Sequence, residues 1–243
     1  MIGRRPGVRI EQNADPRETP GPSSFVDLGE ITVFAESRAY EVSPHRHPAW
    51  KLVLPVGGHA VLGASTGAGV LVPPQYAHAC ATSSAFVAVF LEPWCLRADT
   101  AAPTWLDAPT VRRLLDAAHD GQGLDAEALR AGLTGLMGAP DVDPRIPHAV
   151  RAAAGATRID AVAAELGLSP AGLRALVGAR VGIPLSTMRQ WRRLRAAVGP
   201  LVAAGGARGI ADAAAAAGFA DQAHLTRAAR RFVGRTPGSL RRR

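Results

Sequence analysis

GFADQAHLTRAARRFVGRTPGSLR, residues 218–241, is the stretch that decides how the rest of the chain is interpreted. Gly218 has the backbone freedom that ends a helix, and Asp221 is a favourable N-cap for the next one. Leu225, Ala229 and Phe232 then recur at the spacing of one buried helix face. Just upstream, a second set of apolar residues has the spacing of a buried helix face: Ile210, Ala213, Ala214 and Ala217. Residues 207–234 therefore predict a helix–turn–helix unit.

The second helix of this unit has an outward face near its start, where side chains of a helix–turn–helix reach base edges in the major groove. We predict that Gln222, Ala223, Thr226 and Arg227 read bases there. Glutamine matches adenine and arginine matches guanine through paired hydrogen bonds. The side chains beside this face are predicted to contact phosphate: His224, Arg230 and Arg231.

A similar pattern occupies residues 159–182. Ser169 is placed as an N-cap and Pro170 as the first residue of the second helix. Its predicted base readers are Ala171, Arg174 and Ala175. Glycines at 172 and 178 weaken this helix by up to about 1 kcal/mol each. We therefore expect the second unit to carry more of the specificity or affinity than the first.

Between the units, apolar residues from Leu185 to Leu201 step by three or four positions, which predicts one long helix that separates the two units. Gly199 and Pro200 are expected to kink this helix or end it early. Its polar side is suited to phosphate, with these predicted contacts: Arg189, Arg192 and Arg193, with Arg195 on the same side.

Charge is divided unevenly along the chain. Residues 151–243 hold 16 arginines, no lysine and four acids, a net charge of +12, whereas residues 1–150 have a net charge of −4. A basic half with paired helix–turn–helix patterns predicts binding to duplex DNA. Stacking aromatics are scarce, which argues against an RNA-binding or purely architectural role.

At this point a family resemblance is clear. Residues 218–241 resemble the C-terminal signature of the AraC family of transcription regulators, and GLSPAGLRALVGARVGIPL at 167–185 resembles its first unit. The resemblance covers about residues 145–243. It implies an all-α domain whose two recognition helices enter successive major grooves on one face of the DNA, about 34 Å apart.

The N-terminal part predicts a different architecture. Residues 1–24 are polar and rich in proline and arginine, and we interpret them as a flexible tail. Short β-type runs broken by Gly and Pro follow, then two amphipathic helices within 103–136 that cover the sheet or form a dimer interface. We predict an α+β protein with a cupin-like antiparallel barrel or sandwich at 25–140, a linker near 139–144 and a helical DNA-binding domain at 145–243.

EVSPHRHPAWKLVLPVGGHAVL at 41–62 and GVLVPPQYAHAC at 69–80 resemble the two halves of a cupin motif. His45, His47 and His78 match the histidines of metal-binding cupins, whereas Lys51 falls near the position of their glutamate. With Cys80 as a fourth ligand the set would suit zinc. We weigh that site against histidines that only form hydrogen bonds, and the sequence favours the latter. An effector pocket is predicted from these interior positions: Trp50, Leu52, Val61, Leu71 and Phe86.

The sequence therefore predicts a sequence-specific DNA-binding transcription regulator that responds to a small, partly apolar effector and requires no cofactor. The alternative is a metal-dependent cupin enzyme with a basic accessory domain, which Lys51 disfavours. Expected partners are operator DNA, the effector, RNA polymerase in the case of an activator, and a second copy of the chain. No signal peptide and no apolar run long enough for a membrane span are found, so we expect a cytoplasmic protein.

Overall fold

A computed structural model of the chain describes residues 24–97, 101–118, 125–138, 141–155, 158–203 and 209–240. The predicted flexible tail lies almost wholly outside these residues, as does part of the predicted linker. Within the described ranges, none of the helices has the length and apolar character that a membrane crossing requires.

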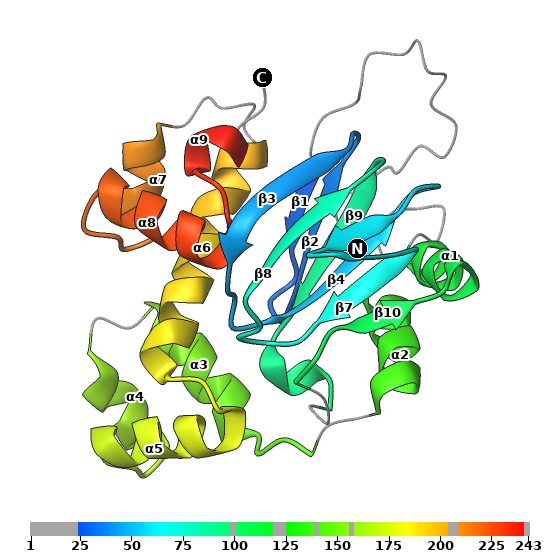
Figure 1. Ribbon diagram of the computed structural model, residues 1–243. Helices are drawn as coiled ribbons and strands as arrows, with labels where there is room; N and C mark the ends of the chain where they lie inside the picture. Colours follow the sequence, from blue (N-terminus) through cyan, green and yellow to red (C-terminus); the bar gives the residue numbers. More distant parts are fainter. Residues whose placement is uncertain are drawn as a thin grey trace, which may run out of the picture.

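The N-terminal half forms two antiparallel sheets that face each other (Figure 1). The larger sheet has the order β1-β2-β9-β4-β7-β10: Ser24–Asp27, Ile31–Glu36, Phe86–Leu91, Trp50–Pro55, Gly69–Val72 and Thr104–Leu106. The smaller sheet has the order β3-β8-β5-β6: Tyr40–His45, His78–Thr82, Ala60–Leu62 and Ser65–Gly67. The antiparallel β architecture expected from the short runs is confirmed.

Side chains of β4 alternate between two environments, as the two-residue period of a strand requires. Trp50, Leu52 and Leu54 pack into a core on the outer face of the larger sheet. Val53 packs into a second core between the sheets, and Lys51 lies on the same side of the strand. Two helices, α1 (Ala108–Ala117) and α2 (Ala126–Met137), contribute apolar residues to the outer core and so cover this face of the sheet.

The C-terminal half is helical, which completes the predicted α+β fold. The helices are α3 (Arg145–Gly155), α4 (Ile159–Glu165), α5 (Pro170–Val181), α6 (Leu185–Ala203), α7 (Ile210–Ala216), α8 (Gln222–Val233) and α9 (Pro237–Leu240). A short 3₁₀ helix, η1 (Pro93–Cys95), follows β9. The long spacer helix is present, and it continues through Gly199 and Pro200 to Ala203 rather than ending before them.

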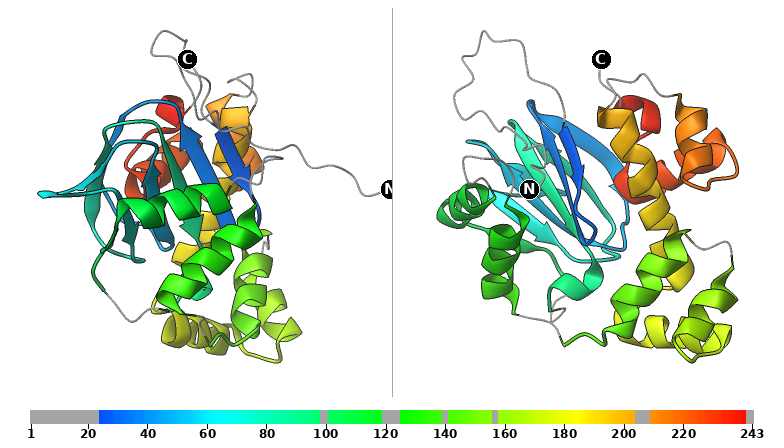
Figure 2. Two further views of the ribbon diagram at one scale, coloured as in Figure 1. Left: turned by 90° about the vertical axis from the view of Figure 1, so that its right-hand side faces the viewer. Right: turned by 180° about the vertical axis from the view of Figure 1, so that it is seen from behind.

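The helical half packs directly on the β half (Figures 1 and 2). Helix α6 contacts β1, and α8 contacts β3. One apolar core joins the outer face of the larger sheet to α3, α4 and α5, and another joins α6, α7 and α8 to Ala49 and Phe90 of the β half. The two helix–turn–helix units are thus held against the sheets by shared cores.

Candidate nucleic-acid interface and interdomain cavity

The second helix–turn–helix unit, α7 and α8, is built by the local signals that predicted it. Gly218 ends the first helix with a φ of 74°, a conformation that favours glycine. The carboxylate of Asp221 accepts a hydrogen bond of 2.6 Å from the backbone N–H of His224 and so caps α8. Phe219 is buried between the helices.

The first unit, α4 and α5, follows the same plan. Gly167 separates the helices with a φ of 66°. The Ser169 hydroxyl accepts a hydrogen bond of 3.0 Å from the backbone N–H of Gly172, and Pro170 is the first helical residue. The two units lie toward opposite ends of α6 (Figure 1). At 1.5 Å per residue the 19 residues of α6 span about 28 Å.

Six of the seven predicted base readers are exposed to solvent on α5 and α8: Ala171, Arg174, Ala175, Gln222, Ala223 and Arg227. Thr226 is half-buried, and its hydroxyl donates a hydrogen bond of 2.9 Å to the carbonyl oxygen of Gln222. That bond leaves the Thr226 methyl group as the natural contact for a base, for example the methyl of thymine. Their accessibility is what a DNA-reading role requires, and the role of each residue stays a prediction.

A groove runs between the two units. Its lining includes a set of predicted DNA contacts: Arg174, Arg189, Arg193, His224 and Arg231. Among the described residues that line it there is no acid, so the groove is basic. Arg193 also has a structural role, because its Nη1 donates a hydrogen bond of 3.0 Å to the carbonyl oxygen of Gly218 in the turn of the second unit. Arg230 and Arg231 are both exposed on α8.

The prediction that Arg192 contacts phosphate is wrong. So is the prediction that Arg195 lies on the phosphate-facing side of the helix. Arg195 is 4% exposed, and its guanidinium donates to Oε1 of Glu92 at 2.8 Å and to the carboxylate of Asp27. Arg192 also pairs with Oε1 of Glu92, at 2.9 Å. Arg192 and Arg195 lie on the same helix as Arg189 and Arg193, which remain candidates for phosphate contacts, but they face the β half. The helical period alone does not show that α6 packs against the β half as well as facing DNA.

A mainly apolar cavity lies where the inner face of the larger sheet meets α6. The β half contributes an aromatic wall, namely Phe25, Phe34, Tyr40, Phe86 and Phe90. The helical half closes the cavity with Trp191, Leu194, Val198, Val233 and Leu240. The space free of protein atoms, including the open mouth, is about 730 Å³.

Polar groups without partners face this apolar space. The hydroxyls of Thr32, Tyr40 and Thr82 are buried and have no hydrogen-bond partner among the residues that the structure describes. Three cations also line it, namely Lys51, Arg195 and Arg235. Lys51 is buried, and burial lowers the pKa of its amine. The Arg235 guanidinium lies 3.8 Å over the Tyr40 ring, and burial lowers its pKa to about 10.

Most of the residues predicted for the effector pocket do not line the cavity. Trp50, Leu52 and Leu71 pack in the outer core beneath the helices, and Val61 is not among the lining residues. Only Phe86 of the predicted five lines the cavity. The alternation of side chains along β4 explains this result, because Lys51 and Val53 occupy the inward positions that were predicted for their neighbours Trp50 and Leu52.

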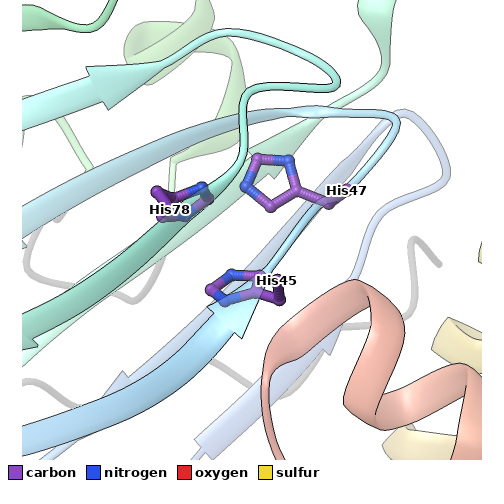
Figure 3. A group of neighbouring side chains, drawn as sticks. All are labelled: His45, His47 and His78. Carbon is purple, nitrogen blue, oxygen red and sulfur yellow. The ribbon is translucent and has the colours of Figure 1, made fainter.

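The three predicted histidines do come together (Figure 3). His45 and His78 face each other across the β3–β8 pair, with ring centroids 4.2 Å apart, and His47 lies 5.0 Å from His78. All three are buried, and burial lowers the pKa of His45 to about 3, that of His78 to about 4, and that of His47 well below its ordinary value. Cys80, the predicted fourth ligand, is not part of this cluster. It lines the cavity beside Lys51 instead.

Comparisons with known proteins agree with this architecture. Residues 162–243 match a family described as a helix-turn-helix domain. No curated protein sequence matches the chain. Among solved structures, ToxT from Vibrio cholerae is similar over 89% of this chain and 98% of its own, with 11% identity and a TM-score of 0.53.

Two ligand complexes of ToxT from the same organism are equally similar. The complex with an unsaturated fatty acid covers 92% of this chain and 96% of ToxT at 13% identity, with a TM-score of 0.52. The complex with (E)-4-(8-methylnaphthalen-1-yl)but-3-enoic acid covers 89% and 98% at 13% identity, with a TM-score of 0.53. At these identities the likeness concerns the fold.

Fold and site together define a two-domain protein in which an antiparallel β domain carries a pair of exposed recognition helices. Residues 162–243 match the helix-turn-helix domain family, as the motif at 218–241 predicted.

Proposed function

We propose that the protein is a DNA-binding transcription regulator of the AraC type. It reads a specific operator with α5 and α8, and an apolar carboxylic acid bound in the interdomain cavity controls it. The observation that carries the DNA-reading role is the exposure of the predicted readers at the two ends of α6, while the apolar faces of the same helices are buried. Such a protein acts on DNA in the cytoplasm and performs no catalysis. Contacts with RNA polymerase and a second copy remain part of the proposal.

The base-reading assignment is tested by comparing selected operator DNA with random duplex of equal length, at one fixed salt concentration. Gln222→Ala and Arg227→Ala should reduce the ratio of the two affinities, by about 1–3 kcal/mol for each lost contact. Arg230→Ala should weaken binding to both DNAs by a similar factor, since phosphate contacts carry no sequence information. Equal losses on both DNAs for all three variants would contradict the assignment.

The chemistry of the cavity supports the carboxylic acid. Its walls are aliphatic and aromatic. Among the described residues that line it, the charged ones are all cations, of which Arg195 is already paired with Glu92 and Asp27. Lys51 and Arg235 are therefore left for an anionic head group, and the unpartnered hydroxyls of Tyr40, Thr32 and Thr82 add hydrogen-bond capacity. Both ligands named in the ToxT complexes combine a carboxylate with an apolar body.

Such a ligand would touch both halves of the protein at once, because the cavity is lined by β strands on one side and by α6 on the other. A ligand that binds this docked arrangement more tightly than an undocked one shifts the population toward it. The position of α6, and with it the placement of both recognition helices, would then depend on the ligand.

The experiment is a titration with oleate or decanoate below its micelle-forming concentration, followed by calorimetry and by the melting temperature. We expect saturable binding that Lys51→Met weakens at least tenfold, whereas the matching alcohol binds poorly to the wild type. Lys51→Met is chosen because methionine preserves the apolar stem. Equal affinity of acid and alcohol would remove the proposed head-group contact, without affecting the DNA-binding assignment.

A further inference from the structure

The cluster of His45, His47 and His78 is not used by the DNA interface or by the apolar cavity. One ring nitrogen from each histidine can be chosen so that all three lie within 4.8 Å of one another. The side chains are 6%, 0% and 6% exposed. We propose that these three histidines bind a divalent transition-metal ion of the zinc class.

The hydrogen bonds of the cluster fix which nitrogen is available. Each Nδ1 lies close to a backbone carbonyl oxygen: His45 to Ser43 at 2.8 Å, His47 to Ala49 at 2.7 Å and His78 to Tyr76 at 3.0 Å. A carbonyl oxygen only accepts, so each Nδ1 carries the proton and donates it. The lone pair of each neutral ring is then on Nε2, which is the arrangement that orients metal-binding histidines.

The state of the three Nε2 atoms is a second, independent observation that points to a ligand. Each of them is buried, and within the described part of the chain none has a hydrogen-bond partner. Buried acceptors without partners are rare in proteins, and three that belong to one cluster point to a shared ligand. Because all three are acceptors, no pair of them can satisfy each other. An electrophile placed among them satisfies all three, and Figure 3 shows the rings grouped around a common region.

The donor set determines the class of metal. Three neutral imidazoles suit Zn²⁺, Co²⁺, Ni²⁺ and related ions, whereas Ca²⁺ and Mg²⁺ require oxygen ligands. A tetrahedral zinc ion with three protein ligands keeps a fourth position for water or another small ligand. Lys51 supplies no anionic ligand, and its positive charge near the cluster opposes a cation, so we expect reversible binding rather than a permanently loaded structural site.

The position of the site gives metal binding a route to the DNA-binding half. The backbone N–H of Arg46, between two of the histidines, donates a hydrogen bond of 3.0 Å to the carbonyl oxygen of Arg231 at the end of α8. The ring of His47 lies 6.5 Å from that of Trp191 on α6. Ligation would therefore fix the segment of β3 on which α8 rests.

The test uses the full chain without a histidine tag, stripped with a chelator and then titrated with Zn²⁺ and, separately, with Co²⁺. We expect one metal ion per chain, a rise in melting temperature with Zn²⁺, and Co²⁺ absorption bands of tetrahedral intensity. His45→Gln and His78→Gln should each lower the affinity at least tenfold. His59→Ala is the matched control, because His59 is an exposed histidine that lies outside the cluster.

Failure of the folded wild-type protein to bind either ion in calorimetry would overturn the proposal, as would unchanged affinity in both glutamine variants. If the glutamine variants do not fold, as judged by circular dichroism, the Co²⁺ spectrum of the wild type decides. Bands of the octahedral aqueous type would contradict a site of three imidazoles, and competition of Zn²⁺ for the tetrahedral signal would support it.

Discussion

Arg195, on α6, donates a hydrogen bond from Nη1 to Oε1 of Glu92, 2.8 Å away, and the two side chains are 4% and 0% exposed. This pair joins the spacer of the DNA-binding half to the end of strand β9. Arg192 contacts the same Oε1 atom of Glu92, and Asp27 completes the group through Arg195. Removing one member of such a group leaves buried charge without compensation.

Glu92→Gln should therefore be strongly destabilising. The two guanidinium groups would keep their positive charge beside a neutral amide, and we expect a loss of about 3 kcal/mol in the free energy of unfolding. Urea unfolding followed by circular dichroism measures this loss. Glu41→Gln is the control, since Glu41 is an exposed acid of β3, and it should change stability by less than about 0.5 kcal/mol. Equal effects of the two substitutions would show that the buried pair is energetically unimportant.

Gly234→Ala and Gly182→Ala form a matched pair for the docking of α8. Both glycines end a recognition helix in the left-handed region, with φ values of 68° and 71°. A Cβ at 234 would collide with the carbonyl oxygen of Ser43 and lie 2.9 Å from Nδ1 of His45, whereas a Cβ at 182 meets nothing within 4 Å. The difference between the variants therefore reports the contact with β3.

We expect each alanine to cost about 1 kcal/mol through its backbone conformation, and Gly234→Ala to cost a further 1–3 kcal/mol or to release α8 from β3. Hydrogen exchange at the amide of Arg46 follows the release directly. It should become faster in Gly234→Ala and stay unchanged in Gly182→Ala. The same exchange rate in both variants would argue against the docked arrangement in solution.

Ser169→Ala should weaken the first unit alone. The serine hydroxyl caps α5, and loss of such a cap costs about 1 kcal/mol. We expect a lower urea midpoint and weaker binding to operator DNA, because Ala171 and Arg174 lie in the first turns of this helix. Ser186→Ala, at an exposed position on α6, serves as the control. A stability unchanged by Ser169→Ala would exclude the cap as a contributor.

The metal-free protein should lose stability in acid between about pH 6.5 and pH 4. Burial lowers the pKa of His45 to about 3 and that of His78 to about 4, from an ordinary value of 6.5. As the pH falls below 6.5, the unfolded chain takes up protons that the folded protein refuses, so unfolding becomes more favourable. For His78 the effect reaches about 3 kcal/mol at most.

Urea unfolding at a series of pH values, with a chelator present, measures this dependence. His78→Gln removes one of the three buried histidines whose pKa is lowered and should flatten the decline over the same range. A wild-type stability that does not change between pH 6.5 and pH 4 would mean that the histidines are protonated in the folded protein.

The helical half could be predicted closely from its sequence because its signals are local. Ser169 and Asp221 cap the helices they were expected to cap, and Gly167 and Gly218 adopt the left-handed conformation at the turns. Each of these features depends on a few neighbouring residues, and the apolar stripes on both sides have the period of a helix.

The contacts between the two halves could not be predicted in the same way. Arg192 and Arg195 have the same local pattern as Arg189 and Arg193. Only their contacts with Glu92 and Asp27, which lie at least 100 residues earlier, distinguish them. The excess positive charge of the C-terminal part was interpreted as an adaptation to DNA alone. Part of it instead holds the acidic N-terminal half, since Arg151 also pairs with Glu30.

The inward face of β4 was missed for a related reason. A strand with both faces buried has apolar residues at nearly every position, and alternation then no longer shows which face is which. The lysine at 51 was the available signal. It is buried between the sheets where they meet the helical half, and a buried cation is costly unless it has a partner.

Helix α6 is one continuous element that does two jobs, because one of its sides closes the cavity and its two ends support the two units. A continuous helix moves as a rigid body, so a displacement of its middle moves both of its ends. A ligand that tilts α6 by a few degrees would therefore reposition both DNA-reading helices in a single step. An operator contacted through two half-sites would then respond as though to one switch rather than to two.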